Sequence, residues 1–178
     1  MSLVFQYGSN ATRGRLNSPS RLAGDAHDLG RAETVDDFDI AFDVYSKTNG
    51  CAASDLVSSP GRRAWGVLYE VADELVRGRR AGGRKTLKAI EGDKYEEKPI
   101  RVRDASGVER EATTFRVKAT ERTNGLATSA AYVSWILYGL REHGVPEDYI
   151  AHVQEVALAA NAGLGDAAAE QSRLIGTL

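Results

Sequence analysis

The sequence predicts an α+β protein whose strands pair mainly antiparallel. Short apolar or alternating segments, separated by turns rich in glycine and proline, fill most of the first 119 residues. After Ser129 the apolar residues change to helical spacing. A chain of 178 residues with 42% hydrophobic side chains suits one domain with one core. We therefore expect a domain over residues 1–162 and an alanine-rich tail over 163–178, which has too little periodicity to place.

The first strand is predicted at Leu3 to Tyr7, where an apolar run stops at Gly8-Ser9-Asn10. Residues 17–30 show no sustained period, so we expect irregular chain with one helical turn near residues 21–27. The clearest strand runs from Phe38 to Tyr45, because apolar and polar residues alternate there. It ends before the turn signal Asn49-Gly50.

Four further strands are predicted, at residues 51–57, 63–71, 95–103 and 111–119. The short spacer Ser58 to Gly61 suggests that the first two are antiparallel neighbours, and Asp104 to Gly107 suggests a hairpin between the last two. All-antiparallel pairing is therefore favoured.

The helices are predicted from spacing and capping signals. A short helix is expected over residues 85–90. A longer helix follows Ser129, a suitable N-cap, and ends at Gly144, which suits the position after a helix. Pro146 is expected at the first position of a last helix that runs to Ala160, with acidic residues in its first turn.

Composition excludes several classes of function. The formal net charge is -2, so we expect no general attraction to nucleic acid or to an anionic membrane. The single cysteine, Cys51, cannot form an intramolecular disulfide, and His27, His143 and His152 lack metal-ligand spacing. We expect no metal and a reduced compartment. No segment has the features of a signal peptide or a membrane span, so a soluble, cytoplasmic protein is expected.

A basic stretch at residues 77–88 carries six Lys and Arg side chains. It lacks the interleaved aromatic residues that stack nucleic-acid bases, and its glycines suggest a loop. We interpret it as a solvated basic loop, with an acidic partner or substrate as the alternative.

Two short motifs suggest chemistry. Tyr7-Gly8-Ser9-Asn10 follows the first strand, where adjacent backbone N–H groups could form an anion-binding nest, although a simple turn has the same signature. Glu91 is predicted at the end of the short helix beside apolar packing. Desolvation and the helix dipole should raise its pKa toward the range of a general base, the alternative being an ordinary exposed glutamate.

Taken in order, these motifs resemble the γ-glutamylcyclotransferase (AIG2-like) family. The resemblance spans residues 3 to about 155 and rests on five segments. They are Tyr7-Gly8-Ser9-Asn10, residues 64–69 (AWGVLY), Ile90-Glu91-Gly92 with Tyr95, Ser129 with Tyr132, and residues 139–150 (GLREHGVPEDYI).

The resemblance implies a small mixed β-barrel flanked by helices and an enzyme that needs no cofactor. In the implied reaction, the α-amine of a γ-glutamyl compound attacks its own γ-carbonyl and releases 5-oxoproline and an amine. Glu91 would transfer the protons, and the backbone N–H groups of Gly8, Ser9 and Asn10 would hold substrate oxygens. The oligomeric state is not predicted.

Tyr7, Tyr95 and Tyr132 match tyrosines that line the family's pocket, the alternative being that each is a packed core residue. Four other aromatic residues are assigned to the core: Trp65, Tyr69, Trp135 and Tyr149.

The chain departs from the family pattern around the site. Lys88 stands where the family often has Asp, Phe115 replaces a common Tyr, and Thr128 replaces a Pro. Insertions are expected near residues 23–29 and 77–83. Because Glu91 is retained, we expect these changes to affect the substrate rather than the reaction.

Two alternatives to the enzyme remain open. A family fold does not determine function, so the same pocket could belong to a non-catalytic module that binds a small metabolite. The basic stretch could also recruit a nucleic acid or an acidic protein, although the net charge makes nucleic acid unlikely.

Overall fold

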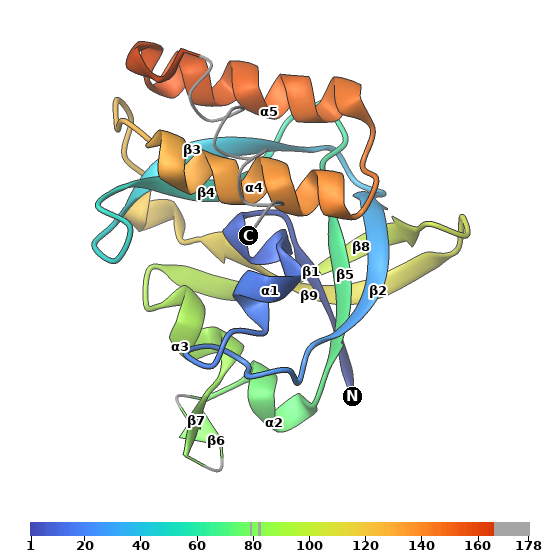
Figure 1. Cartoon of the computed structure of the whole chain (residues 1–178). Helices are drawn as coiled ribbons and strands as arrows, with labels where there is room; N and C mark the ends of the chain where they lie inside the picture. The colour runs from blue at the N-terminus through green and yellow to red at the C-terminus, as the bar shows by residue number, and fades with distance from the viewer. Residues whose placement is uncertain (79, 82, 166–178) are drawn as a thin grey trace.

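A closed five-stranded barrel forms the centre of the computed structural model, which describes residues 1–78, 80–81 and 83–165 (Figure 1). Around the barrel the strands follow the order β1 (Ser2–Gln6), β5 (Trp65–Val71), β2 (His27–Thr34), β8 (Tyr95–Asp104) and β9 (Glu109–Val117). The predicted mixed, mainly antiparallel barrel is confirmed.

The barrel closes through one parallel pair, in which Val4 of β1 lies opposite Thr113 of β9. Its other pairs are antiparallel. All-antiparallel pairing was therefore a wrong expectation, for a geometric reason. Strand direction reverses across each antiparallel pair, so a closed ring with an odd number of strands needs at least one parallel pair.

Strand β2 corrects the prediction of irregular chain at residues 17–30. Turns occupy residues 19–24, without the predicted helical turn, and β2 begins at His27. Only Ala32 and Thr34 of its eight residues are buried, and its register shifts between Asp28 and Gly30. The alternating apolar pattern that signals a strand is therefore missing from this segment.

Strands β3 (Phe38–Ser46) and β4 (Cys51–Ser58) form a separate hairpin. The predicted pairing of the strand at 51–57 with the strand at 63–71 is wrong, because β4 pairs with β3 while β5 pairs with β1 and β2. Both edges of β5 are thus occupied within the barrel, and no edge remains for β4. The predicted hairpin of β8 and β9 is confirmed and projects from the barrel (Figure 1).

Helices α4 (Ala130–Glu142) and α5 (Glu147–Ala160) lie together over the β3–β4 hairpin (Figure 1). As predicted, the Ser129 side chain caps α4 by accepting from Tyr132 N at 3.2 Å, and Gly144 follows the helix with a φ of 65°. Pro146 is the N-cap of α5 rather than its first residue, since its carbonyl accepts from Ile150 N.

Shorter elements complete the fold. The predicted helix at 85–90 is α3 (Leu87–Glu91), which starts after the capping residue Thr86, whose Oγ1 accepts from Ala89 N. The predicted tail at 163–178 lies outside the described residues from 166 onward, so the domain boundary stays a prediction. The remaining elements are α1 (Arg13–Leu16), α2 (Asp73–Val76), the strand pair β6 (Arg80–Ala81) and β7 (Arg84–Lys85), and 3-10 turns at Ser9–Ala11, Ala119–Glu121 and Ala162–Leu164.

Close backbone contact fixes the segment after β1 against α4. A Cβ added at Gly139 would lie 2.6 Å from Thr12 N, so only glycine allows this approach. Two side-chain bonds support it: Thr12 Oγ1 donates to the carbonyl of Trp135 at 2.6 Å, and the Tyr69 hydroxyl donates to the carbonyl of Ala11 at 2.9 Å. The turn at Ser9–Ala11 is therefore held on both sides.

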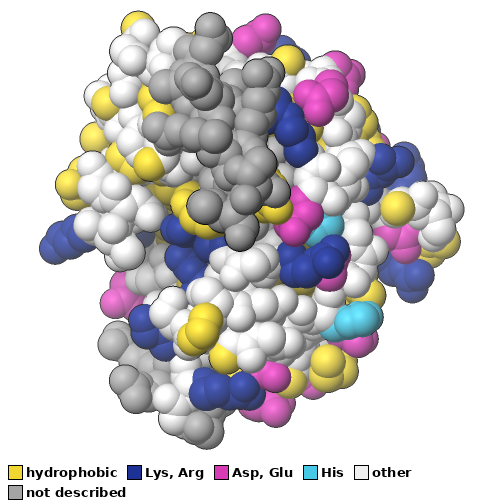
Figure 2. Space-filling view, in the orientation of Figure 1, with side chains coloured by type: hydrophobic (Ala, Val, Ile, Leu, Met, Phe, Trp, Pro, Cys, Tyr) yellow, Lys and Arg dark blue, Asp and Glu magenta, His cyan; other side chains and the backbone are white. Residues whose placement is uncertain are grey.

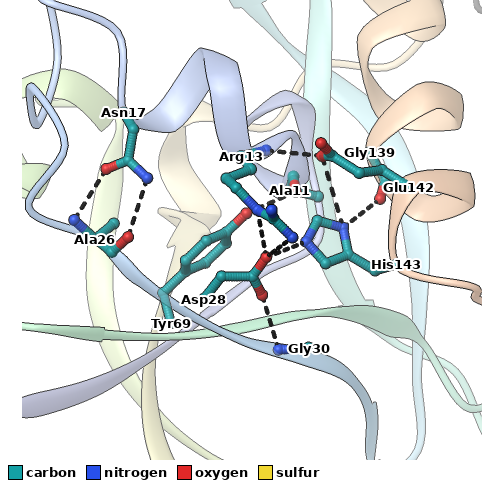
Figure 3. A network of polar contacts seen from close by, with 10 residues as sticks. All are labelled: Ala11, Arg13, Asn17, Ala26, Asp28, Gly30, Tyr69, Gly139, Glu142 and His143. Atoms are coloured by element: carbon teal, nitrogen blue, oxygen red, sulfur yellow. Dashed lines mark hydrogen bonds and ion pairs between the residues drawn. The ribbon is translucent and has the colours of Figure 1, made fainter. Parts of the chain in front are cut away.

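A polar network joins β2 to α1 and to the end of α4 (Figure 3). Asp28 Oδ2 accepts from Arg13 Nε at 2.7 Å and contacts His143 Nε2 at 2.9 Å, while Oδ1 accepts from Gly30 N at 2.8 Å. The other ring nitrogen of His143 lies 2.6 Å from the carbonyl of Gly139. The bulge in β2 is thus tied to both helices.

The described part of the chain contains no helix long and apolar enough to cross a bilayer. Within the same residues, no group of three His, Cys, Asp or Glu side chains could hold a metal ion. On the face shown in Figure 2, basic and acidic side chains are interspersed.

Candidate active site

The segment after β1 lines a small cavity and contains unpaired backbone donors. In the described chain, the backbone N–H groups of Gly8, Ser9 and Asn10 donate to no protein acceptor, whereas Ala11 N donates to the carbonyl of Gly8 at 2.9 Å. A Cβ at Gly8 would lie 2.4 Å from Ser54 Oγ, so a side chain there would close the approach. The segment has the unpaired amides that the predicted nest requires.

Glu91 faces this segment from the end of α3. Its Oε1 accepts a hydrogen bond from Asn10 Nδ2 at 2.9 Å, across 81 residues of sequence. Gly92 follows with a φ of 89°, a conformation that lets the chain turn away directly after the glutamate. The carboxyl group is therefore not an exposed helix-end glutamate pointing into solvent, as the alternative interpretation would have it.

The surroundings of Glu91 raise its pKa, as the sequence predicted. Burial is the largest cause, because it disfavours the charged form. The Asn10 hydrogen bond and the charge of Arg21 oppose it, as do Gln6 and Lys88 more weakly. Glu91 retains partial exposure, since it borders a cleft, but desolvation outweighs its donors.

Three tyrosines enclose the same space, and their hydroxyls bind the protein itself. The Tyr7 hydroxyl donates to the carbonyl of Phe115 and the Tyr95 hydroxyl to the carbonyl of Ser54, each at 2.7 Å. The Tyr132 hydroxyl accepts from Ser54 N at 3.1 Å. Burial is the main reason that the pKa of each tyrosine is raised, so the hydroxyls stay neutral. Tyr7 and Tyr95 thus shape the pocket more than they offer donors to it.

Two connected cavities result. The inner one measures about 30 Å³, close to the volume share of one water molecule. The outer cleft measures about 330 Å³ and shares Ser9, Asn10, Glu91, Tyr95 and Tyr132 with it. The inner cavity is lined by Gln6, Tyr7, Gly8, Ser9, Asn10, Ser54, Glu91, Tyr95, Phe115 and Tyr132. The seven predicted site residues are therefore brought together around it, and their roles in binding stay predictions.

Sequence reasoning missed Gln6, Ser54 and Arg21. Gln6 is 5% exposed, and its Nε2 is buried without a hydrogen-bond partner while its side chain borders the inner cavity. A polar residue directly before Tyr7 was a usable signal for it. Arg21 Nη1 donates to Asn10 Oδ1 at 2.7 Å. Nothing in the sequence of residues 17–30 marked this arginine.

The pair Arg21 and Asn10 determines how Glu91 is held. A guanidinium only donates hydrogen bonds, so the amide oxygen of Asn10 must face Arg21 and its NH₂ group must face the glutamate. The Asn10 side chain therefore presents a donor to Glu91.

The residues that depart from the family pattern have structural partners. Lys88 Nζ donates to the carbonyl of Tyr95, and Thr128 Oγ1 donates to the carbonyl of Ala52 at 2.9 Å. Phe115 lines the inner cavity, and its carbonyl accepts the hydrogen bond of the Tyr7 hydroxyl. Tyr69 and Tyr149 are buried as predicted, whereas Trp65 and Trp135 are partly exposed.

The basic stretch is partly neutralised. Arg77 Nη2 pairs with Glu97 at 2.7 Å, and Arg84 pairs with Asp25. Residues 79 and 82 and the side chains of 80 and 81 lie outside the described part. The interpretation as a solvated loop stays a prediction.

Comparisons with known proteins agree on one family and one fold. The sequence profile of the AIG2-like family matches residues 63–153. The chain resembles the structure of a gamma-glutamyl cyclotransferase with a TM-score of 0.72 and 22% identity, over 86% of each chain. An uncharacterized protein from Homo sapiens gives a TM-score of 0.66 and 22% identity over the same shares.

A third similar structure is YkqA from Bacillus subtilis, with a TM-score of 0.65 and 17% identity over 88% of this chain and 54% of that protein. None of the curated protein sequences matches the chain. At these identities the structural likeness supports the fold alone, so activity must be argued from the site.

Proposed function

Because the chain belongs to the AIG2-like family, we propose that it is a γ-glutamyl cyclotransferase that releases 5-oxoproline from a small γ-glutamyl compound. One observation carries the proposal: the partly desolvated Glu91 carboxyl, held by Asn10, lines the same small cavity as Gly8, Ser9 and Asn10, whose backbone N–H groups have no acceptor in the described chain. A movable proton and fixed oxygen-binding donors are the two requirements of acyl transfer to an amine.

Proton transfer is the proposed role of Glu91. The substrate's α-amine is protonated near neutral pH and must lose a proton as it attacks the γ-carbonyl carbon. A second proton leaves the same nitrogen once the new C–N bond has formed. Glu91 accepts one of these protons and returns it to the departing nitrogen as the original amide C–N bond breaks, while the other passes to solvent and the released amine takes up a proton from solvent. A new C–N bond closes the lactam ring, and no water is consumed. A raised pKa suits this exchange, because it brings the carboxyl closer to the operating pH.

The amides of Gly8, Ser9 and Asn10 are proposed to bind the oxygen on which negative charge develops. The inner cavity of about 30 Å³ accommodates one oxygen rather than a larger group. Loss of one such donor typically costs about 2.7–4 kcal/mol of transition-state stabilisation. Folding of the substrate against the tyrosine walls would contribute up to about 7–11 kcal/mol through proximity, since nucleophile and carbonyl belong to one molecule.

A product assay tests the proposal. The protein is incubated with γ-glutamyl amino acids and γ-glutamyl amines, and 5-oxoproline is measured by mass spectrometry. We expect Glu91→Gln to lower kcat about 10²–10⁴-fold, the usual contribution of a positioned acid-base group. Glu109→Gln is the matched control, because Glu109 is an exposed acid that pairs with Arg103 on the β8–β9 hairpin.

Two results would contradict parts of the proposal, the first the role of Glu91 and the second the enzymatic activity itself. Full activity in Glu91→Gln would remove Glu91 from the mechanism. Saturable thermal stabilisation by γ-glutamyl compounds without any product would instead identify a non-catalytic binding module that uses the same pocket.

A further inference from the structure

We propose that Arg15 and Arg21 form an anion-binding site beside the candidate active site, and that it receives a carboxylate or phosphate carried by the leaving amine. This inference rests on the proposed function for the identity of the ligand, but the site itself is argued from the two guanidinium groups. It would restrict the substrates to γ-glutamyl compounds whose released amine is acidic.

The site is a groove of about 600 Å³ next to the outer cleft. Both arginines border it, together with hydroxyl side chains and the ring of Trp135. The Arg15 guanidinium lies 5.3 Å from the centre of that ring, a cation–π arrangement that holds its plane. The hydroxyl residues of the groove are Thr12, Ser18, Ser20, Thr48 and Tyr138.

Neither guanidinium has an acidic partner within the described chain. Arg15 Nη2 donates to Asn49 Oδ1 at 3.3 Å, and its Nε is buried with no hydrogen-bond partner. Arg21 makes its hydrogen bond to the neutral amide of Asn10. Other arginines differ: Arg13 and Arg77, for example, form ion pairs with carboxylates at 2.6 and 2.7 Å.

The nearby carboxyl groups do not neutralise the pair. Glu142 borders the groove, but its Oε2 accepts from Arg13 N at 3.1 Å and lies 3.9 Å from His143 Nδ1. Glu91 attracts both arginines, yet it makes no ion pair with either. Two like charges therefore share a partly desolvated wall, and in the described chain no carboxylate forms an ion pair with either of them.

This arrangement is costly unless an anion is bound. Burial lowers the pKa of both arginines, and the charge of Arg21 lowers that of Arg15 further. A desolvated cation without an acidic partner opposes folding. An incoming carboxylate or phosphate accepts several N–H bonds from such a pair and removes the repulsion.

The position of the groove indicates which part of a ligand reaches it. Arg21, Thr48 and Asn49 border both the groove and the outer cleft that contains Glu91. α1 lies between the α4–α5 layer and α3 in Figure 1, and basic side chains stand in this band on the face of Figure 2. A substrate that reacts beside Glu91 would therefore extend its leaving amine past Arg21 toward Arg15.

The experiment compares matched substrates in Arg15→Leu, because Arg15 has no contact with Glu91 or Asn10 among its hydrogen bonds. γ-Glutamylalanine is compared with γ-glutamylalanine amide, and γ-glutamylphosphoethanolamine with γ-glutamylethanolamine. We expect the wild type to favour each anionic member by about tenfold or more, mainly through KM. Arg15→Leu should lose that preference, because its kcat/KM should fall much more for the anionic member than for the neutral one. Arg103→Leu, an exposed arginine, is the control.

A preference for γ-glutamylalanine over its amide would indicate that the site binds a carboxylate. A preference for γ-glutamylphosphoethanolamine over γ-glutamylethanolamine would indicate a phosphate. An undiminished preference in Arg15→Leu would overturn the proposed site. If the wild type converts none of these compounds, the cyclotransferase proposal fails and the site is judged by thermal shift with γ-glutamylalanine and with inorganic phosphate. Stabilisation of the wild type but not of Arg15→Leu would then support the site, and the absence of stabilisation by either probe would refute it.

Discussion

Two carboxyl groups, Glu91 and Asp28, show how the same chemical group is given opposite properties in one fold. Asp28 contacts three donors, from Gly30, Arg13 and His143, and its pKa is lowered although burial acts to raise it (Figure 3). Glu91 accepts its hydrogen bond from one neutral amide, that of Asn10, and its pKa is raised. At Asp28 the donors together outweigh burial, whereas at Glu91 burial outweighs the donors, and this balance decides which form is favoured.

The difference separates a structural role from a reactive one. A carboxylate with several donors stabilises the fold and binds a proton less readily. A carboxyl group whose burial outweighs its donors costs stability when it ionises, but it binds a proton more readily. The comparison predicts opposite responses when each group is neutralised.

The largest effect on stability is expected for Asp28→Asn. Loss of the charge weakens hydrogen bonds to Arg13 and His143, and charge-assisted bonds of this kind contribute about 1.5–3 kcal/mol. We expect the free energy of unfolding to fall by about that amount, as measured by urea denaturation at neutral pH. A variant as stable as the wild type would show that the network in Figure 3 does not hold β2 to the helices.

The same variant has a pH signature. Because the folded pKa of Asp28 is lowered, its stabilisation is present above the unfolded value, about 3.9, and is lost as the pH falls through the folded pKa. The difference in Tm between wild type and Asp28→Asn should therefore shrink toward about pH 3. If the difference in Tm does not depend on pH, the variant is destabilised by altered hydrogen-bond geometry and not by loss of the Asp28 charge.

A smaller change in stability, of opposite sign, is expected when Asp43 is neutralised. Asp43 lies at the bulge of β3. Burial, and secondly the charge of Asp55, raise the pKa of Asp43 to about 6, while Arg122 at 3.7 Å opposes this increase. Its ionisation therefore costs stability as the pH rises from about 4 to 6. We expect Asp43→Asn to gain about 1 kcal/mol at about pH 7.5 and little at about pH 4, measured by thermal unfolding.

For Glu91→Gln the same reasoning gives the direction of a stability change. The folded pKa is raised, so ionisation destabilises the folded protein once the pH passes the ordinary glutamate value. The variant should therefore unfold at a higher temperature than the wild type at alkaline pH, and this advantage should vanish in acid. Lower stability of Glu91→Gln at every pH would make Glu91 a structural residue like Asp28.

The finest test of the comparison removes the Asn10 donor. Asn10→Ala deletes the hydrogen bond that lowers the pKa of Glu91, so that pKa should rise further. The acidic limb of the kcat/KM profile should move to higher pH, because catalysis needs the ionised form. If the acidic limb of the profile stays at the same pH in Asn10→Ala, a group other than Glu91 is responsible for it.

Much of the fold followed from local patterns. Alternation at Phe38 to Tyr45, the hairpin signal at residues 104–107, and the caps Ser129 and Gly144 each act within a few residues, so the sequence reveals them directly. β2 was not predicted, because its polar residues and its bulge at Asp28 to Gly30 remove the alternation of apolar and polar residues that marks a strand. Its place in the barrel comes from pairing with β5 and β8.

Some residues of the candidate site could likewise be predicted from the sequence, and others could not. Its seven predicted residues were found through their order and resemblance, and the structure gathers them around one cavity. Gln6, Ser54 and Arg21 were not found, because their importance lies in what they face. The amide of Gln6 is significant only because it is buried without a partner.

By itself the sequence determined the approximate limits of α4 and α5, the hairpin of β8 and β9, and an acidic side chain at the end of a short helix. These features depend on neighbours a few positions apart. Only the tertiary structure decided the parallel closure of β1 on β9, the opposition of Glu91 to Asn10, and the pairing of two arginines without an acid. Such properties arise from distances between groups far apart in the chain, where hydrogen bonding and electrostatics act through space.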